Sequence, residues 1–137
     1  MRAHADAPPE ILTALRDASR GLPEVVEERA WVGTRWRVRT KTFAHVVPIA
    51  EGWPPAYVKV AGSEGPLTVL TFRAPPEEVE ALGATGAPFF LPGWWPDIVG
   101  MALDDGTDWT EVAELVTESY CLLAPKKLAD QVARPGD

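Results

Sequence analysis

Residues 35–41 read RWRVRTK, in which cations alternate with Trp36, Val38 and Thr40. Successive side chains of a β-strand point to opposite faces of the sheet. The stretch therefore predicts one strand with a largely apolar face and a second face that carries every cation. These cations are Arg35, Arg37, Arg39 and Lys41. One buried face and one solvated face are typical of an antiparallel sheet.

Further apolar runs on either side of this stretch predict the rest of the sheet. Each is short, rich in β-branched or aromatic residues, and followed by glycine, proline or aspartate, which mark turns. The runs are 25–31, 43–49, 57–60, 67–72 and 98–103. The strand at 43–49 continues from the alternating stretch.

Three segments predict helices. The first opens after Asp6 or Ala7 with two prolines, which the first helical turn tolerates, and Gly21 ends it. A short helix opens in the same way at Pro75-Pro76 and ends at Gly83. The third begins at Asp108, which forms a capping-box pair with Glu111, and carries an apolar stripe with helical period up to Pro125.

This order predicts an α+β fold of two layers. We expect an antiparallel sheet of about five to six strands, packed on one face by the N- and C-terminal helices plus the short helix. The length of 137 residues suits one domain, which we place at residues 8–132. Flexible tails are expected at residues 1–7 and 133–137.

Composition limits the kinds of site and the cellular location that we expect for the protein. The lone Cys121 excludes an internal disulfide and a cysteine-cluster metal site. No apolar run approaches the roughly 18 residues that a membrane span needs, and the first ten residues lack the apolar stretch of a secretory signal. We expect a cytoplasmic protein that has no membrane partner.

The net charge of −7 hides a strong segregation of charges. Residues 35–73 carry a charge of +4, whereas residues 74–118 hold ten acidic side chains and no basic one. The basic strand face can be a surface that contacts phosphates, because guanidinium groups match phosphate geometry. The alternative is a solvated face balanced by the acids of 77–118.

The six tryptophans divide into two groups. Trp31, Trp36 and Trp109 fall in periodic patterns and are expected in the core. Trp94 and Trp95 lie in a loop rich in glycine and proline. They either pack that loop onto the core or form an aromatic platform for a base or an apolar ligand.

Enzyme signatures are missing from the sequence. It has no glycine-rich phosphate loop, no HExxH and no GxSxG motif. His4 falls in the predicted tail, so His45 is the one imidazole expected in the fold, and a lone strand histidine is usually packed or solvated. We expect no catalytic residue, no metal ligand set and no cofactor.

Several short motifs resemble the MmcQ/YjbR family in their joint order. They are LPEVVEE at 22–28, the Lys-x-Phe-Ala stretch from Lys41 to Ala44, Val58-Lys59, and Ser119-Tyr120 at the end of the last helix, with Lys126-Lys127 after it. The resemblance covers about residues 8–132.

The resemblance implies a fold of the CyaY-like or secretion-chaperone-like kind, and DNA binding through wing-like strands and loops. By position, Lys41 and Phe43 match the family's Lys-x-Phe-Ala strand, Lys59 matches a lysine on a second strand, and Ser119-Tyr120 match the pair at the end of the last helix. Members tend to have a basic-aromatic stretch before the last strand. Here that place is occupied by Trp95-Pro96-Asp97-Ile98, without a base.

Three functions remain open at this point. The first is a non-enzymatic nucleic-acid-binding module in which Arg35, Arg37, Arg39, Lys41 and Lys59 touch the phosphates of DNA. The second is a protein-interaction module, chaperone-like or homodimeric, that matches a basic face to an acidic one. The third is a small-ligand-binding protein, which requires Trp94, Trp95, His45 and Tyr57 to meet in a pocket.

Overall fold

The structure, a computed structural model, describes residues 6–132. Most of the two predicted tails, at 1–5 and 133–137, lies outside this range. Residues 6 and 7 are anchored to the domain: Ala7 is buried, and the Asp6 carboxylate accepts a hydrogen bond from the Thr34 hydroxyl at 2.8 Å and pairs with Arg29 at 2.6 Å.

One antiparallel sheet organises the molecule, and its strands follow the spatial order β1-β2-β3-β4-β6-β5. The strands are β1 (Val25–Arg29), β2 (Thr34–Val38), β3 (Lys41–Ile49), β4 (Leu67–Arg73), β5 (Phe89–Phe90) and β6 (Ile98–Leu103). The helices are α1 (Pro9–Ala18), α2 (Pro55–Ala61), α3 (Pro76–Thr85), α4 (Trp109–Leu123) and α5 (Lys126–Ala129). The predicted α+β class is confirmed.

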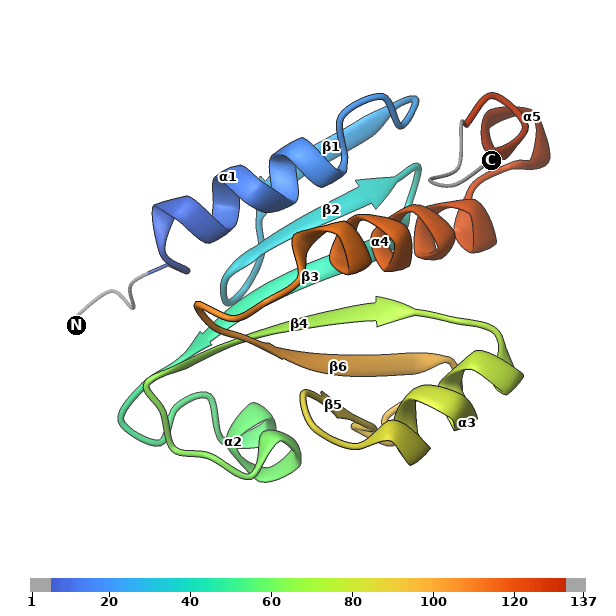
Figure 1. The fold of residues 1–137 in the computed structure, drawn as a ribbon. Coiled ribbons are helices and arrows are strands. Elements are labelled where there is room, and N and C mark those ends of the chain that lie inside the picture. The colour runs from blue at the N-terminus through green and yellow to red at the C-terminus, as the bar shows by residue number, and fades with distance from the viewer. Residues whose placement is uncertain (1–5, 133–137) are drawn as a thin grey trace.

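Helices α1 and α4 cross the same face of the sheet (Figure 1), which we call the helix-covered face. The largest core cluster lies beneath them and includes Trp36, Phe43 and Tyr120. Asp108 caps α4 as predicted, because its carboxylate accepts from the backbone N–H groups of Thr110 and Glu111 at 3.0 and 3.2 Å.

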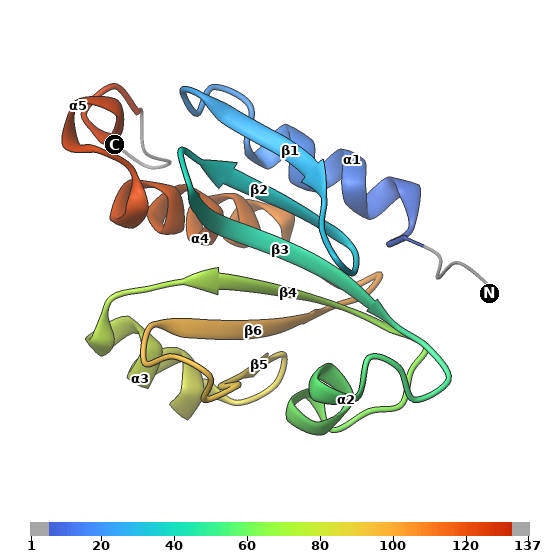
Figure 2. The ribbon, with the colours of Figure 1, turned by 180° about the vertical axis from the view of Figure 1, so that it is seen from behind.

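The opposite face, which we call the outer face, is only partly covered (Figure 2). Helix α2 packs over its end beside β3 and β4, where Tyr57 joins a second, smaller core cluster with Val47 and Val69. The half of this face formed by β1, β2, the start of β3 and the end of β4 carries no helix. We call it the open half of the outer face.

The alternating stretch that predicts one strand is in fact a hairpin. Strand β2 ends at Val38, Arg39 adopts a positive φ of 56°, and β3 begins at Lys41. Only Arg35 and Arg37 therefore lie on β2, so the prediction of four cations on one strand is wrong. The turn residues Arg39 and Thr40 continue the alternation of cationic and uncharged residues. The pattern alone therefore cannot show that the strand is interrupted there.

The register slips by one residue where β2 meets β3. Trp36 faces Ala44 and Arg37 faces Thr42, so Phe43 is left over as a bulge. Phe43 and Ala44 both join the core beneath α1 and α4. As a result, Thr42 and His45 project from the outer face although three positions separate them.

Three other predictions need correction. Residues 57–60 form helix α2 instead of a strand, because Pro54-Pro55 opens a helix as the other proline pairs do. Lys59 therefore stands on a helix. Helix α3 runs past Gly83 to Thr85 and ends at Gly86. Trp31, expected in the core, is 82% exposed in the loop between β1 and β2.

Candidate ligand cleft on the outer sheet face

A cleft of about 250 Å³ lies at the border between the open half of the outer face and the part that α2 covers. Four of its aromatic residues come from three segments outside the sheet: Trp31 from the loop after β1, Tyr57 from α2, and Trp94 and Trp95 from the loop before β6. Its polar residues come from the sheet. They are Arg35, Thr42, His45, Thr71 and Arg73.

Local structure fixes the position of Trp31. The loop between β1 and β2 closes with a hydrogen bond from the Ala30 N–H to the Gly33 carbonyl, at 3.0 Å. Gly33 has a φ of 71°, and a Cβ at this position would collide with the Val46 carbonyl. Only glycine lets the loop approach β3 so closely. The Trp31 ring then meets the Trp53 ring, with centroids 5.5 Å apart.

The other aromatic walls also contact each other. Trp94 meets Tyr57 at a centroid distance of 5.0 Å and an interplanar angle of 74°, and Tyr57 meets His45 edge-on at 6.3 Å. Trp95 is 56% exposed and carries the Arg73 guanidinium 5.2 Å above its ring. Such edge contacts and cation–π contacts hold rings in place without covering all of their faces.

His45 is held as a neutral donor and acceptor. One ring nitrogen, Nε2, lies 2.6 Å from the Val32 carbonyl and must donate to it, so Nδ1 keeps a lone pair that faces the Tyr57 hydroxyl at 3.4 Å. Burial lowers the pKa of His45, and the nearby Arg35 adds to this, although the bond to Val32 acts in the opposite direction. Burial also raises the pKa of Tyr57 to about 12, so its hydroxyl keeps its proton.

The cations predicted to bind phosphate are mostly paired with carboxylates. Glu28 of β1 binds both Arg35, at 2.7 Å, and Arg37, at 2.8 Å, while Glu24 binds Arg39 at 2.9 Å. These hydrogen bonds, first from Arg37 and then from Arg35, lower the pKa of Glu28. The balancing acids therefore come from β1 and its approach, and not from residues 77–118.

The predicted cations do not form one group. Arg35 borders the cleft and Arg37 neighbours it on β2, whereas Arg39 occupies the hairpin turn. Lys41, at the start of β3, and Lys59, on α2, are exposed and make no ion pair within residues 6–132. Arg73, which the sequence did not single out, pairs with Asp97 at 2.6 Å and reaches the cleft.

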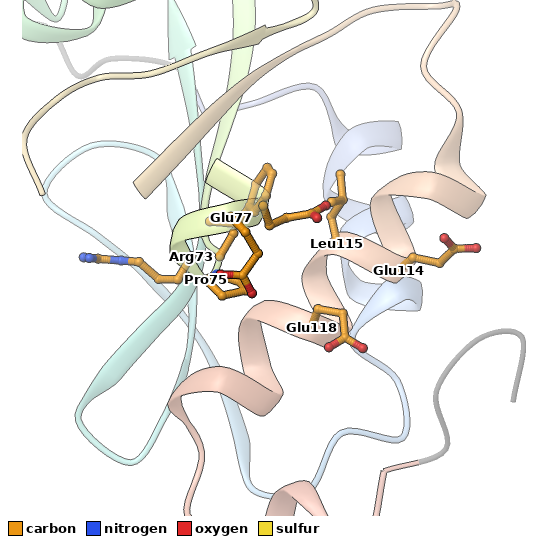
Figure 3. Close-up of a pocket in the computed structure, with 9 residues that line it drawn as sticks. Arg73, Pro75, Glu77, Glu114, Leu115 and Glu118 are labelled. Atoms are coloured by element: carbon orange, nitrogen blue, oxygen red, sulfur yellow. The ribbon is translucent and has the colours of Figure 1, made fainter. Parts of the chain in front are cut away.

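A second hollow, of about 290 Å³, lies between the start of α3 and α4. Glu77, Glu114 and Glu118 surround it, and Figure 3 shows the Arg73 side chain extending away from these carboxylates. Three acidic residues of the 74–118 segment thus gather beside the helices, while Arg35, Arg37 and Arg73 lie on the outer face. Within residues 6–132, no group of three or more His, Cys, Asp or Glu side chains is arranged to hold a metal ion.

The motif residues Ser119, Tyr120 and Phe43 serve the fold. The buried Ser119 hydroxyl donates to the carbonyl of the bulged Phe43 at 2.6 Å and accepts from the Arg73 N–H at 2.8 Å. Tyr120 donates to the Pro23 carbonyl at 2.6 Å and packs edge-on against Phe43. These contacts fasten α4 across β3 and β4.

The fold and the cleft define an α+β protein with a small aromatic and cationic hollow on a half-open sheet face. A family model described as YjbR matches residues 20–122, and the chain belongs to this family. Comparison with curated proteins gave no match, and comparison with solved structures gave none either. In the part of the chain that the structure describes, no helix has the length and apolar character needed to cross a membrane.

Proposed function

We propose that the protein is a non-enzymatic nucleic-acid-binding module that holds a single strand of DNA against the open half of the outer face. The observation that carries the proposal is the pair of exposed tryptophans beside guanidinium groups: Trp31 is 82% and Trp95 is 56% exposed, with Arg35 and Arg73 next to them in the cleft. Stacking platforms combined with cations are typical of surfaces that bind single strands.

A single strand suits this surface better than a duplex. Base faces are available for stacking only where bases are unpaired, and aromatic stacking tolerates every sequence. The open half also has few side chains that could enter a groove and read base edges, because its arginines lie along the sheet in ion pairs with Glu28 and Glu24. We therefore expect little sequence preference.

The ion pairs on the open half limit the expected affinity for DNA. A phosphate must compete with the Glu28 carboxylate for Arg35 and Arg37, which lie 43% and 31% exposed at their side chains. One carboxylate shared by two guanidinium groups leaves one positive charge in surplus at this point. Acidic residues of α3 and α4 repel the same polyanion at longer range. Binding should be modest and salt-sensitive.

The non-enzymatic part of the proposal rests on His45. Its Nε2 proton is committed to the Val32 carbonyl, and its lowered pKa favours the neutral form. The Nε2 proton cannot be transferred without breaking that bond, and the Nδ1 lone pair faces the Tyr57 hydroxyl at 3.4 Å. A general acid or base needs a pKa near the working pH and a free proton site.

The proposal is tested by titrating labelled single-stranded and duplex DNA with the full chain at about 50 mM salt. Glu28→Gln should tighten binding and steepen the salt dependence by about 0.7 per additional phosphate contact on a single strand. Glu10→Gln is the matched control, because it changes the net charge equally from an exposed position on α1, on the helix-covered face. The double substitution Arg37→Ala/Arg39→Ala should weaken binding.

Absence of binding by the unaltered protein at low salt would end the proposal. So would equal binding by the Arg37→Ala/Arg39→Ala variant, or equal gains from Glu28→Gln and Glu10→Gln, since a gain from net charge alone requires no particular surface. Sedimentation of the same samples separates the remaining alternative: a salt-dependent dimer without DNA binding supports an interaction module instead.

A further inference from the structure

The cleft has the size and chemistry of a site for one ring system. Its volume of about 250 Å³ is just below the roughly 300–1,000 Å³ of sites for drug-sized ligands. Apolar and aromatic walls with a few convergent polar groups are the usual composition of such sites. The aromatic walls here are Trp31, Tyr57, Trp94 and Trp95, and the polar groups lie on the sheet beneath them.

The walls are positioned before any ligand arrives. Trp94 is fixed against Tyr57, and Tyr57 is fixed against His45 by the edge contact and by the hydroxyl that faces Nδ1. His45 is in turn tied to the Val32 carbonyl. A preorganised wall avoids the entropy cost of ordering side chains on binding. Trp95, the more exposed of the pair, leaves ring surface available for stacking.

The cationic groups lie at the rim of the same cleft. Arg73 is anchored by Asp97 at 2.6 Å and lies over the Trp95 ring at 5.2 Å, while Arg35 belongs to β2 beside His45 of β3. A ligand that combines a flat ring with a phosphate would therefore meet aromatic carbon with the ring and guanidinium donors with the phosphate. A nucleotide combines these two parts in one molecule.

We propose that the cleft is a pocket for a single nucleotide, whose base contacts Trp94 and Trp95 and whose phosphate lies at Arg35 and Arg73. The proposal deepens the nucleic-acid-binding function and rests on it, since the pocketed nucleotide would be one unpaired residue of the bound strand. It adds a property that a purely electrostatic surface lacks: a free nucleoside monophosphate should bind in the same place.

Indole N–H resonances in an amide correlation NMR spectrum report ligand contact at individual tryptophans, because each of the six tryptophans contributes one resonance. A nucleoside 5′-monophosphate should shift the signals of Trp94 and Trp95, while buried Trp36 on the helix-covered face should not respond. Ribose 5-phosphate and inorganic phosphate, which lack the base, should shift them far less. Substitution of each tryptophan by phenylalanine assigns the signals.

Two variants test the ring contact and the phosphate contact separately. Trp95→Ala should weaken nucleotide binding about tenfold, within the range that stacking on one base supplies, and Arg73→Gln should weaken the monophosphate more than the free nucleoside. Leu122→Ala is the control for an exposed apolar side chain, because Leu122 is 46% exposed on α4. Arg20→Gln is the control for an exposed guanidinium after α1.

The possible outcomes test the nucleotide pocket separately from the proposed binding of single-stranded DNA. If oligonucleotides bind but about 10 mM monophosphate, enough to reveal millimolar affinity, shifts no cleft indole, the pocket proposal is wrong and the binding surface stands. Equal shifts with ribose 5-phosphate would also overturn it, because the base would then play no part. If the monophosphate shifts the cleft indoles and oligonucleotides fail to bind, the pocket is supported and the single-strand function is wrong.

Discussion

Trp31 and Trp36 lie five positions apart on one hairpin and belong to two different regions of the molecule. Trp36 is 1% exposed beneath the helices, and its indole N–H donates to Glu27 at 3.2 Å, whereas Trp31 is 82% exposed beside the cleft. The helix-covered face holds the residues that make the fold, and the motif residues Phe43, Ser119 and Tyr120 all lie there. The open half of the outer face holds none of these core residues. Its side chains are therefore available for binding without being needed for the stability of the fold.

The largest expected effect is the contrast between these two tryptophans. Trp36→Ala should lower the free energy of unfolding by about 3–5 kcal/mol, because it leaves a large cavity in the core. Trp31→Ala should change it by less than about 0.5 kcal/mol, as is usual for exposed positions. Denaturant unfolding of both variants measures this. Similar losses from the two substitutions would show that the outer face also determines stability.

Ser119→Ala should have the next largest effect. The hydroxyl satisfies the Phe43 carbonyl at the bulge and the Arg73 N–H where β4 ends, and both bonds disappear with it. Each buried polar group left without a partner costs about 1–3 kcal/mol, so for two groups a loss of about 2–6 kcal/mol is expected. Glu114→Ala, at an exposed position on the same helix, is the control. A loss under 1 kcal/mol would mean that water replaces the hydroxyl.

The pH dependence of stability gives a smaller effect that reports on the outer face. Because the pKa of His45 in the fold lies below its ordinary value of 6.5, the unfolded chain binds a proton that the folded chain does not. The free energy of unfolding should therefore be constant above pH 6.5 and fall as the pH drops from 6.5 towards the folded-state pKa. One proton limits the slope to about 1.4 kcal/mol per pH unit.

Unfolding of the His4→Gln protein, measured against the His4→Gln/His45→Gln double variant, isolates this contribution, since the chain has two histidines. The Glu27 and Glu28 carboxyls, whose pKa values are lowered by Arg16 and by Arg37 respectively, titrate below this window. The same slope in both proteins would contradict the assignment to His45 and would indicate that the outer face admits the charged imidazole without cost.

Much of the architecture could be predicted because it depends on local chemistry. The aspartate cap of α4, the proline-led start of α3 and the bounds of β6 at Ile98–Leu103 follow from residues that are neighbours in the chain. The predicted strand at residues 57–60 was wrong because local chemistry there gives conflicting signals. Their valines favour a strand, yet the preceding prolines and the packing of Tyr57 against Val47 and Val69 select the helix.

The candidate site could be predicted only in part. His45, Tyr57, Trp94 and Trp95 were grouped as a condition for a pocket, and the structure brings them together. Trp31, Thr42 and Arg73 were missed as members of that pocket. The position of Trp31 two residues before the turn glycine Gly33 is a signal that could have placed it in a loop. Nothing in the sequence pairs Glu28 with both Arg35 and Arg37, because that pairing depends on the register of β1 against β2.

By itself, the sequence determined the class of fold, the order of most elements, the segregation of charge and membership in a family. These follow from periodicity, capping and composition, which act over a few residues. Tertiary structure decided which cations are neutralised, which tryptophans are exposed and which side chains share a cleft. The reason is the distance between the partners along the sequence. The Ser119 bond to Phe43, for example, joins positions 76 residues apart. Such a contact forms only when the strands have paired in their final register and the helices have packed on one face of the sheet.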